Sequence, residues 1–270
     1  MTREESLGGR LAGRIRRTVI ERAYAAHVGH IGSALSIVDI LAALYGDVIN
    51  GMPDDPNRDR LVLSKGHAAL ALYAALAETG RLDRALLDEY CSDGTVVGVH
   101  PEHLAPGIDF STGSLGQGLS LGTGAALAAR LDGSARRSFV VVSDAECNEG
   151  SVWEAVMFAA HHKLANLVAI IDLNGQQAFG YTRDVLDLLP LGDRFRAFGW
   201  DVHDADGTNP DELAHVINAL DTHSGAPHVV IAKTIFGRGV SFMESTIDWH
   251  YWPLNDEQYA QALAELEAAS

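Results

Sequence analysis

Two polar residues directly follow apolar stretches that are typical of buried strands. Asp144 follows Ser138–Ser143, and Asn174 comes just after Leu167–Asp172, about thirty residues further along the chain. In an open α/β sheet, ligands bind at the carboxyl ends of the strands, so neighbouring strand ends could bring both side chains to one point. A carboxylate and a carboxamide oxygen suit a hard cation such as Mg²⁺, which commonly bridges to phosphate. The alternative is that both residues only turn the chain.

The strands that must position these residues are short and apolar. Ser138–Ser143, Leu167–Asp172 and His228–Lys233 are rich in Val and Ile and predict strands buried on both faces, with Trp200–Ala205 as a candidate fourth strand. A strand, a helix and a second strand within about 35 residues form a βαβ unit, which predicts a parallel sheet. The helix between the first two strands is predicted from one apolar stripe, formed by Val152, Trp153, Val156, Met157, Ala160 and Leu164.

Other segments complete the predicted fold. Asn209 is a helix cap followed by Pro210 and two acids, and residues 256–268 predict a closing amphipathic helix. The glycine-rich stretch Gly116–Gly122 lacks the third glycine of a dinucleotide fingerprint, because Leu121 stands there; we interpret it as a close-packing surface. With no repeat or linker in view, residues 1–270 are predicted to form one α/β domain, a parallel sheet with helices on both faces.

Composition excludes several function classes. Twenty basic against 36 acidic residues give a net charge of −16, which would repel nucleic acid and anionic membranes. The start, Met1–Gly9, is polar rather than signal-like, and no apolar run is long enough to span a bilayer. The two cysteines, Cys91 and Cys147, form no metal-type pair, which suits a reducing compartment. These observations predict a cytoplasmic protein.

A series of motifs surrounds the two strand-end residues. Asp144 lies in Ser143-Asp144-Ala145, and Glu149–Ala155 and His162–Leu167 stand between it and Asn174. Upstream, four further segments follow in order: Gly29-His30-Ile31-Gly32-Ser33, Ser64-Lys65-Gly66-His67, Val99-His100-Pro101-Glu102 and Ser111–Gly118. From about residue 20 to 257, this order resembles the thiamine diphosphate enzymes and, within them, the transketolases. Each motif is weak alone, and their common order carries the signal.

This resemblance implies a cofactor site for thiamine diphosphate. Mg²⁺, or another divalent cation such as Ca²⁺ or Mn²⁺, is expected on Asp144, the side chain of Asn174 and the backbone carbonyl of Gln176. The backbone N–H of Ala145 is expected to face the diphosphate, and His67 to contact it. The other implied cofactor-binding residues are Ser33, Gly113, Ser114, Leu115, Lys233 and His250.

The resemblance also implies catalytic residues. His30, His100 and His250 are expected to orient hydroxyl and carbonyl oxygens and exchange protons with them, since histidine titrates near neutrality. Glu149 and Glu154 match family acids at a subunit interface that couples two active sites. For Glu149 an alternative is that it only complements a helix amino end.

A partner chain is the next implication. The family's pyrimidine-binding domain carries the glutamate that activates the cofactor, and no segment up to Ser270 matches it. We therefore expect a second polypeptide that supplies this domain, in a heterotetramer with two copies of each chain. The expected reaction transfers a two-carbon ketol unit from a ketose to an aldehyde, with sugars or sugar phosphates as substrates. Two alternatives stay open: a non-catalytic cofactor- or partner-binding module, and a 2-oxo acid dehydrogenase-type decarboxylating subunit.

The sequence departs from the family pattern in three places. Ser143 and Ala145 replace two glycines around Asp144, which leaves the ligand in place. Ala178-Phe179 replace Ile-Asp, and Tyr251-Trp252 replace Gly-Lys after His250. Loss of that lysine predicts poor use of ordinary phosphorylated aldose acceptors, unless both rings pack against the partner instead. A different alternative, zinc bound by the histidine pairs at 27/30 and 100/103, lacks a matching carboxylate pattern.

Overall fold

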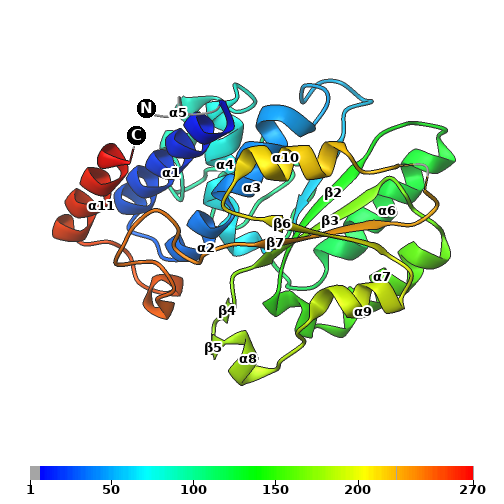
Figure 1. Ribbon diagram of the computed structural model, residues 1–270. Coiled ribbons are helices and arrows are strands. Elements are labelled where there is room, and N and C mark those ends of the chain that lie inside the picture. Colours follow the sequence, from blue (N-terminus) through cyan, green and yellow to red (C-terminus); the bar gives the residue numbers. More distant parts are fainter. Residues whose placement is uncertain (1–6, 223, 270) are drawn as a thin grey trace, which may run out of the picture.

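The computed structural model describes residues 7–222 and 224–269. At its centre lies a five-stranded sheet in which all neighbouring strands run parallel, as the sequence predicts (Figure 1). All strands therefore present their carboxyl ends at the same edge. In spatial order the strands are β1 (Arg60–Leu63), β2 (Ser138–Ser143), β3 (Leu167–Leu173), β7 (His228–Lys233) and β6 (Asp201–Asp206).

Helices cover both faces of this sheet. One face packs against α1 (Leu7–Ala26), α3 (Val38–Ala43), α4 (Ala69–Glu78) and α10 (Pro210–Asn218), and the other packs against α6 (Gly118–Leu131), α7 (Gly150–His161) and α9 (Leu191–Ala197). In β2, Phe139 and Val141 belong to the first core cluster and Val140 and Val142 to the second. Because successive side chains alternate between two cores, the central strands are apolar at nearly every position.

The predicted strands are largely confirmed. Three of them match the structure to within a residue, and the fourth runs over Asp201–Asp206, one residue later than predicted. Trp200 precedes it and is buried, with its ring N–H donating to the carbonyl of Val156 at 3.0 Å. The edge strand β1 was not predicted, because a stretch of four residues carries little periodic signal.

The predicted helices are confirmed with one correction. Asn209 caps α10 by accepting from the Glu212 N–H at 3.2 Å, and α11 covers Asp256–Ala268 as predicted, lying beside α1 (Figure 1). In α7 the buried residues are Val152, Ala155, Val156 and Ala159. The predicted stripe was wrong at Met157, which is 50% exposed, because small alanines rather than the larger side chain face the sheet. Leu164 is buried beyond the end of the helix.

Short elements link these layers and carry most of the polar residues of interest. Within the described part of the chain, no helix is both long and apolar enough to cross a membrane. The predicted polar start lies partly in residues 1–6, outside the described residues. The short elements are α2 (Ile31–Ser36), η1 (Leu44–Val48), η2 (Gly66–Ala68), α5 (Arg84–Asp88), η3 (Ala145–Asn148), β4 (Gln176–Gln177), β5 (Gly180–Tyr181), α8 (Thr182–Val185) and η4 (Ile247–His250).

Candidate active site

A cavity of about 340 Å³ opens at the carboxyl edge of the sheet. Segments that follow β1, β2 and β3 contribute to it, together with α2 and η4. Its lining comprises His30, Ser33, Lys65, His67, His100, Gly113, Leu115, Ser143, Ala145, Asn148, Glu149, Asn174, Gln176, Gln177, Ala178, Phe179 and His250. Size and position both suit a small-molecule site.

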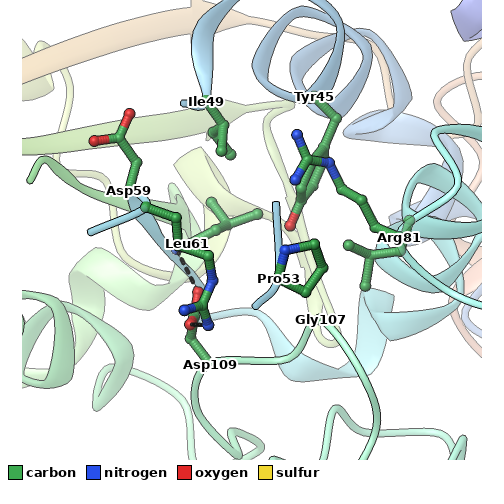
Figure 2. A pocket seen from close by; sticks show the side chains of 10 residues that line it. Tyr45, Ile49, Pro53, Asp59, Leu61, Arg81, Gly107 and Asp109 are labelled. Carbon is green, nitrogen blue, oxygen red and sulfur yellow. Dashed lines mark hydrogen bonds and ion pairs between the residues drawn. The ribbon is translucent and has the colours of Figure 1, made fainter. Parts of the chain in front are cut away.

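A second cavity lies near the amino end of β1 and is far smaller. Figure 2 shows Tyr45, Arg81 and Asp109 around it, and its volume is about 20 Å³. That is room for about one water molecule. The Nε of Arg81 has no hydrogen-bond partner within the described chain, so a water suits this place better than a substrate. A wider hollow of about 640 Å³ also lies at the amino ends of the strands, lined by residues such as Asp59, Asp132 and Arg136, and contains none of the predicted site residues. The cavity at the carboxyl edge is therefore the candidate site.

Asp144 and the loop after β3 come together beside this cavity, whose lining includes Ser143, Ala145 and Asn174 but not Asp144 itself. Asp144 accepts from its neighbour Ala145 N–H at 2.9 Å and from Gly175 N–H at 2.8 Å. The side-chain oxygen of Asn174 accepts from the Gln176 N–H at 2.9 Å. Since β2 and β3 are parallel neighbours, with Ser143 opposite Asp172, the predicted convergence of the two strand ends is confirmed.

The donor set at this end fits a hard divalent cation. Carboxylate, carboxamide and backbone carbonyl oxygens are the ligands that Mg²⁺ accepts. Three carboxyl groups are buried near this point, those of Asp144, Glu146 and Asp172. The positive charge that faces them is Lys65, the one buried lysine among the described residues, whose Nζ lies 2.5 Å from Asp172. Burial, followed by the charge of Asp172, raises the pKa of Asp144 to about 7. A bound cation would offset this excess of negative charge.

Three histidines form a triangle in the lining of the cavity. The ring centroids of His30, His67 and His250 lie 5.1 to 5.4 Å from one another. Burial lowers the pKa of His250 to about 4 and also lowers the pKa of His30 and His67, with further lowering by neighbouring cations. At neutral pH all three rings are therefore uncharged, so that each can donate one hydrogen bond and accept another. His250 contacts the hydroxyl of Ser33 at 3.4 Å.

The glycine-rich segment closes another wall. Gly113 packs against the ring of His100, where an added Cβ would lie 3.2 Å from the ring. Gly116 has a φ of +79° and faces Glu149, and a Cβ at Gly118 would lie 2.4 Å from the side chain of Ser64. A Cβ at Gly122 would meet Val140 at 2.1 Å. The prediction of a close-packing surface is confirmed, with the chain's own sheet as the surface that it contacts.

Some predicted site residues do not reach the cavity. Ser114 and Lys233 are exposed and lie outside its lining, and Glu154 is exposed on α7. Strand β7 ends at Lys233, and the backbone there, not the side chain, contacts Gly207. His103 contacts Ser111, and the described residues contain no group of three or more His, Cys, Asp or Glu arranged for a metal ion. Nothing in the structure therefore supports the zinc alternative.

The aromatic pair after His250 lies beside the cavity. Tyr251 is 52% exposed and Trp252 64% exposed, and neither is part of the lining. The hydroxyl of Tyr251 donates to the carbonyl of Ala178 at 2.5 Å. Two of the departures from the family pattern thus contact each other: Tyr251 holds the loop that presents Phe179 to the cavity mouth.

Sequence reasoning missed the buried acids near the site. Asp172 accepts from Ser36 at 2.7 Å and pairs with Lys65, and Glu146 accepts from four donors. A charged residue at the end of an otherwise apolar strand, such as Asp172, was the available signal. Glu146 had none, because an acid in a loop usually faces solvent.

An open parallel α/β sheet with a cavity and a histidine cluster at its carboxyl edge is the architecture of α/β proteins that bind small ligands at their strand ends. The chain belongs to the transketolase family. Its residues 9–268 match the family model described as "Transketolase, thiamine diphosphate binding domain".

Relatives with this architecture include transketolase subunits of similar length and longer transketolases. The chain is 41% identical over 254 residues to an apulose-4-phosphate transketolase subunit of Phocaeicola vulgatus, covering 93% of this chain and 90% of that protein. It is 42% identical over 257 residues to a 6-deoxy-6-sulfo-D-fructose transketolase subunit of Clostridium sp., covering 94% of each. The transketolase structure from Leishmania mexicana superposes with a TM-score of 0.88 at 27% identity, covering 98% of this chain but 42% of that one. The chain therefore spans less than half of that transketolase.

Proposed function

We propose that this chain binds thiamine diphosphate and Mg²⁺ in the 340 Å³ cavity and, with a partner chain, transfers a two-carbon ketol unit from a ketose to an aldehyde. The observation that carries the proposal is that Asn174 and three uncharged histidines line one cavity, while Asp144 lies buried between the lining residues Ser143 and Ala145 and accepts from the Gly175 N–H. Family membership and the similarity to transketolase subunits support it. Bound thiamine diphosphate supplies an electron sink for breaking and making a carbon–carbon bond.

The metal end has a direct assignment. Asp144, the side-chain oxygen of Asn174 and the backbone carbonyl of Gln176 hold the cation, and His67 contacts the diphosphate. The Ala145 N–H, which donates to Asp144 at 2.9 Å in this structure, exchanges that bond for the diphosphate when the ligand binds. Ser33, Gly113 and Leu115 line the cavity and provide further cofactor contacts. Ser114 and Lys233 receive no role, because both are exposed outside the lining of the cavity.

The histidine end handles the substrate. His30, His100 and His250 line the cavity, and uncharged His30 and His250 can each donate to one substrate oxygen and accept from another. Their role is to orient the hydroxyl and carbonyl oxygens and to move a proton between them. Glu149 lines the cavity beside the glycine segment, whereas Glu154, exposed on α7, is assigned to a subunit contact.

A partner chain completes the site in this proposal. Several exposed apolar side chains occur on α7 and on residues 179–189, which follow the cavity loop, and exposed apolar surface is a mark of protein interfaces. Relatives that match this chain over most of their length are named subunits, which also supports a partner. We propose a pyrimidine-binding subunit that carries the activating glutamate, two copies of each chain, and a cytoplasmic location, where free Cys91 and Cys147 stay reduced. These exposed apolar side chains are Met157, Phe158, Phe179, Tyr181, Val185, Leu186 and Leu189.

Ketol transfer by the assembled enzyme tests the function. The chain would be co-expressed with its partner, and transfer from a ketose donor to a series of aldehydes followed by mass spectrometry. Transfer that requires thiamine diphosphate and Mg²⁺ is expected. Oxidative release of CO₂ from a 2-oxo acid without ketol transfer would instead favour the decarboxylating alternative, and cofactor binding without turnover would favour the non-catalytic module.

Acceptor choice forms a separate prediction. The lining contains Lys65 as its only lysine or arginine among the described residues, and that group pairs with Asp172. The chain itself therefore offers little to a phosphate end group, although relatives are named for a phosphorylated and a sulfonated sugar. We expect poor use of ribose 5-phosphate and erythrose 4-phosphate, and improved use by a Tyr251→Gly, Trp252→Lys variant. Efficient use by the wild type, unchanged in the variant, would mean that the partner supplies the anion contact.

A further inference from the structure

Glu146 is a fully buried carboxylate behind the wall of the cavity. Its Oε1 accepts from the Ser64 hydroxyl at 2.6 Å and from the Gly116 N–H at 2.9 Å. Its Oε2 accepts from the N–H and the hydroxyl of Ser143 at 2.9 and 3.2 Å. Although burial raises the pKa of Glu146, these hydrogen bonds favour the ionised form. An acceptor-only group with two oxygens is what four converging donors require.

The three residues that Glu146 holds each lie in or beside a segment of the candidate site. Ser64 lies just before the segment that carries His67, and Ser143 lies just before Asp144. Gly116 belongs to the glycine segment whose residues Gly113 and Leu115 line the cavity. Glu146 itself lies outside the lining. One side chain thus connects three segments that face the cavity, without facing it.

The glycine segment depends most on this link. Two other hydrogen bonds hold parts of this segment: the Ser151 hydroxyl donates to the Gly116 carbonyl at 3.0 Å, and the Thr112 hydroxyl donates to the Leu63 carbonyl at 2.6 Å. The Gly116 N–H, however, is satisfied by Glu146. Leaving a buried N–H without a partner is costly enough to favour a displaced loop. Close packing of Gly118 on Ser64 would then be lost as well.

We infer that Glu146 is a positioning residue that fixes the glycine segment, residues 112–118, against the diphosphate end of the cavity. The identity of the ligand in this inference rests on the proposed function. The connection between Glu146 and the glycine segment does not, because it rests on the hydrogen bonds of Glu146. Within this arrangement the carboxylate sets how closely the backbone of the segment approaches the ligand. Its effect should therefore appear in cofactor affinity rather than in the rate of the saturated enzyme.

The test compares Glu146→Gln with a matched control, Cys147→Ala. Glutamine has nearly the same shape as glutamate, but an NH₂ group replaces one of the two carboxylate oxygens. This NH₂ group would face N–H and O–H groups that donate to Glu146 in the wild type. Cys147 is the next residue, equally buried, and its sulfur makes one weak contact, 3.7 Å to the Ser143 carbonyl. Two quantities are measured: amide hydrogen exchange of residues 112–118 in the full chain without cofactor, and the Kd for thiamine diphosphate of the assembled enzyme in Mg²⁺.

For Glu146→Gln we expect exchange in residues 112–118 to rise about tenfold or more, and the Kd to rise by a similar factor. Excess cofactor should restore most of kcat. Cys147→Ala should lower the melting temperature without either change. Where Glu146→Gln fails to fold, Ser64→Ala removes one donor alone and should produce smaller changes in the same direction.

Two results would overturn the inference. Unchanged exchange in residues 112–118 would show that other contacts hold the segment, whatever the cofactor does. Faster exchange with an unchanged Kd would show that the segment does not set cofactor affinity. A wild-type assembly that never binds thiamine diphosphate is a different result: it would remove the proposed function, while the exchange measurement would still decide whether Glu146 holds the segment.

Discussion

Asp144 has the most direct role that a single residue has in the proposed site. It is the one charged group among the three proposed metal ligands, and it lies at a strand end rather than in the apolar core. Its carboxylate already collects the N–H groups of Ala145 and Gly175, so its removal would also free the loop that carries Asn174. Neutral Asn174 cannot replace the lost charge.

Substitution of Asp144 by alanine should therefore abolish cofactor retention while the fold persists. Even residues that only support a metal ligand commonly change metal affinity 10–100-fold, so loss of the ligand itself should exceed about 100-fold. Calorimetry of the assembled enzyme with Mg²⁺ and thiamine diphosphate measures this, and circular dichroism checks the fold. Asp132→Ala, at the exposed end of α6, is the control. Normal affinity in Asp144→Ala would mean that Asp144 only turns the chain.

The histidine triangle makes stability depend on pH. In the folded chain the pKa of His250 is about 4, against 6.5 ordinarily, and the pKa values of His30 and His67 are also lowered. Between pH 6.5 and about 4 the unfolded chain binds protons that the folded chain does not. The free energy of unfolding therefore falls as the pH falls through this window.

Between pH 7 and pH 5 the melting temperature should drop further in the wild type than in His250→Gln, which cannot take up a proton; carboxyl groups with a raised pKa, such as Asp144, act in the opposite direction but equally in both. Differential scanning calorimetry at both pH values measures this difference. His161→Gln, exposed at the end of α7, should keep the full drop of the wild type. An equal drop in His250→Gln and wild type would show that His250 titrates normally in the folded chain.

At the scale of elements, the packing of α6 on the sheet depends on glycine. A Cβ at Gly122 would lie 2.1 Å from the Val140 side chain, whereas a Cβ at Gly124, two residues on in the same helix, would meet nothing within 4 Å. Both positions have the same intrinsic preference for alanine in a helix, worth roughly 0.5–1 kcal/mol. They differ only in the space available.

This pair permits a matched prediction. Gly122→Ala should lower the free energy of unfolding by about 1–3 kcal/mol through overpacking, and Gly124→Ala should raise it by about 0.5–1 kcal/mol. Urea denaturation measures both. Equal stabilisation by the two substitutions would show that α6 can move away from β2 at little cost. Because α6 follows the glycine segment directly, the Gly122 variant should also weaken cofactor binding in the assembled enzyme.

At the scale of the whole molecule, the chain presents an open cavity and an exposed apolar surface beside it. Phe179 is 85% exposed although it lines the cavity, so the mouth lacks a cover on this side within the described chain. In the proposed enzyme, the partner supplies that cover together with the pyrimidine site. The chain by itself then contacts only the diphosphate end of the cofactor.

The isolated chain should therefore bind thiamine diphosphate weakly. Calorimetry with Mg²⁺ and cofactor is expected to show little heat for this chain, and clear binding after the partner is added. Mg²⁺ with pyrophosphate, which lacks the pyrimidine ring, should bind the isolated chain about as well as the full cofactor. Tight binding of thiamine diphosphate by the isolated chain would contradict the two-chain proposal.

The sequence by itself determined four strands of the sheet and the meeting of two strand ends beside the cavity. Strands such as Ser138–Ser143 are buried on both faces, and continuous apolar runs report that burial locally. Parallel strands end at one edge, so Asp144 and Asn174 had to meet once the strands were recognised. The ordered motifs added the histidines, and His30, His67, His100 and His250 do line one cavity.

Only the tertiary structure decided which other polar groups take part. Glu146 looks like a solvated loop acid in the sequence, yet it is buried and accepts from the distant Ser64 and Gly116 as well as from nearby Ser143. Lys233 looks like a strand-end cofactor contact, yet its side chain lies exposed outside the cavity. Tyr251 looks like a channel residue, yet its hydroxyl binds the Ala178 backbone. The local sequence pattern reports which positions of a helix or strand are buried. The direction of a side chain in a loop or at a strand end depends instead on residues that are far away in the sequence and that only the packed fold brings together.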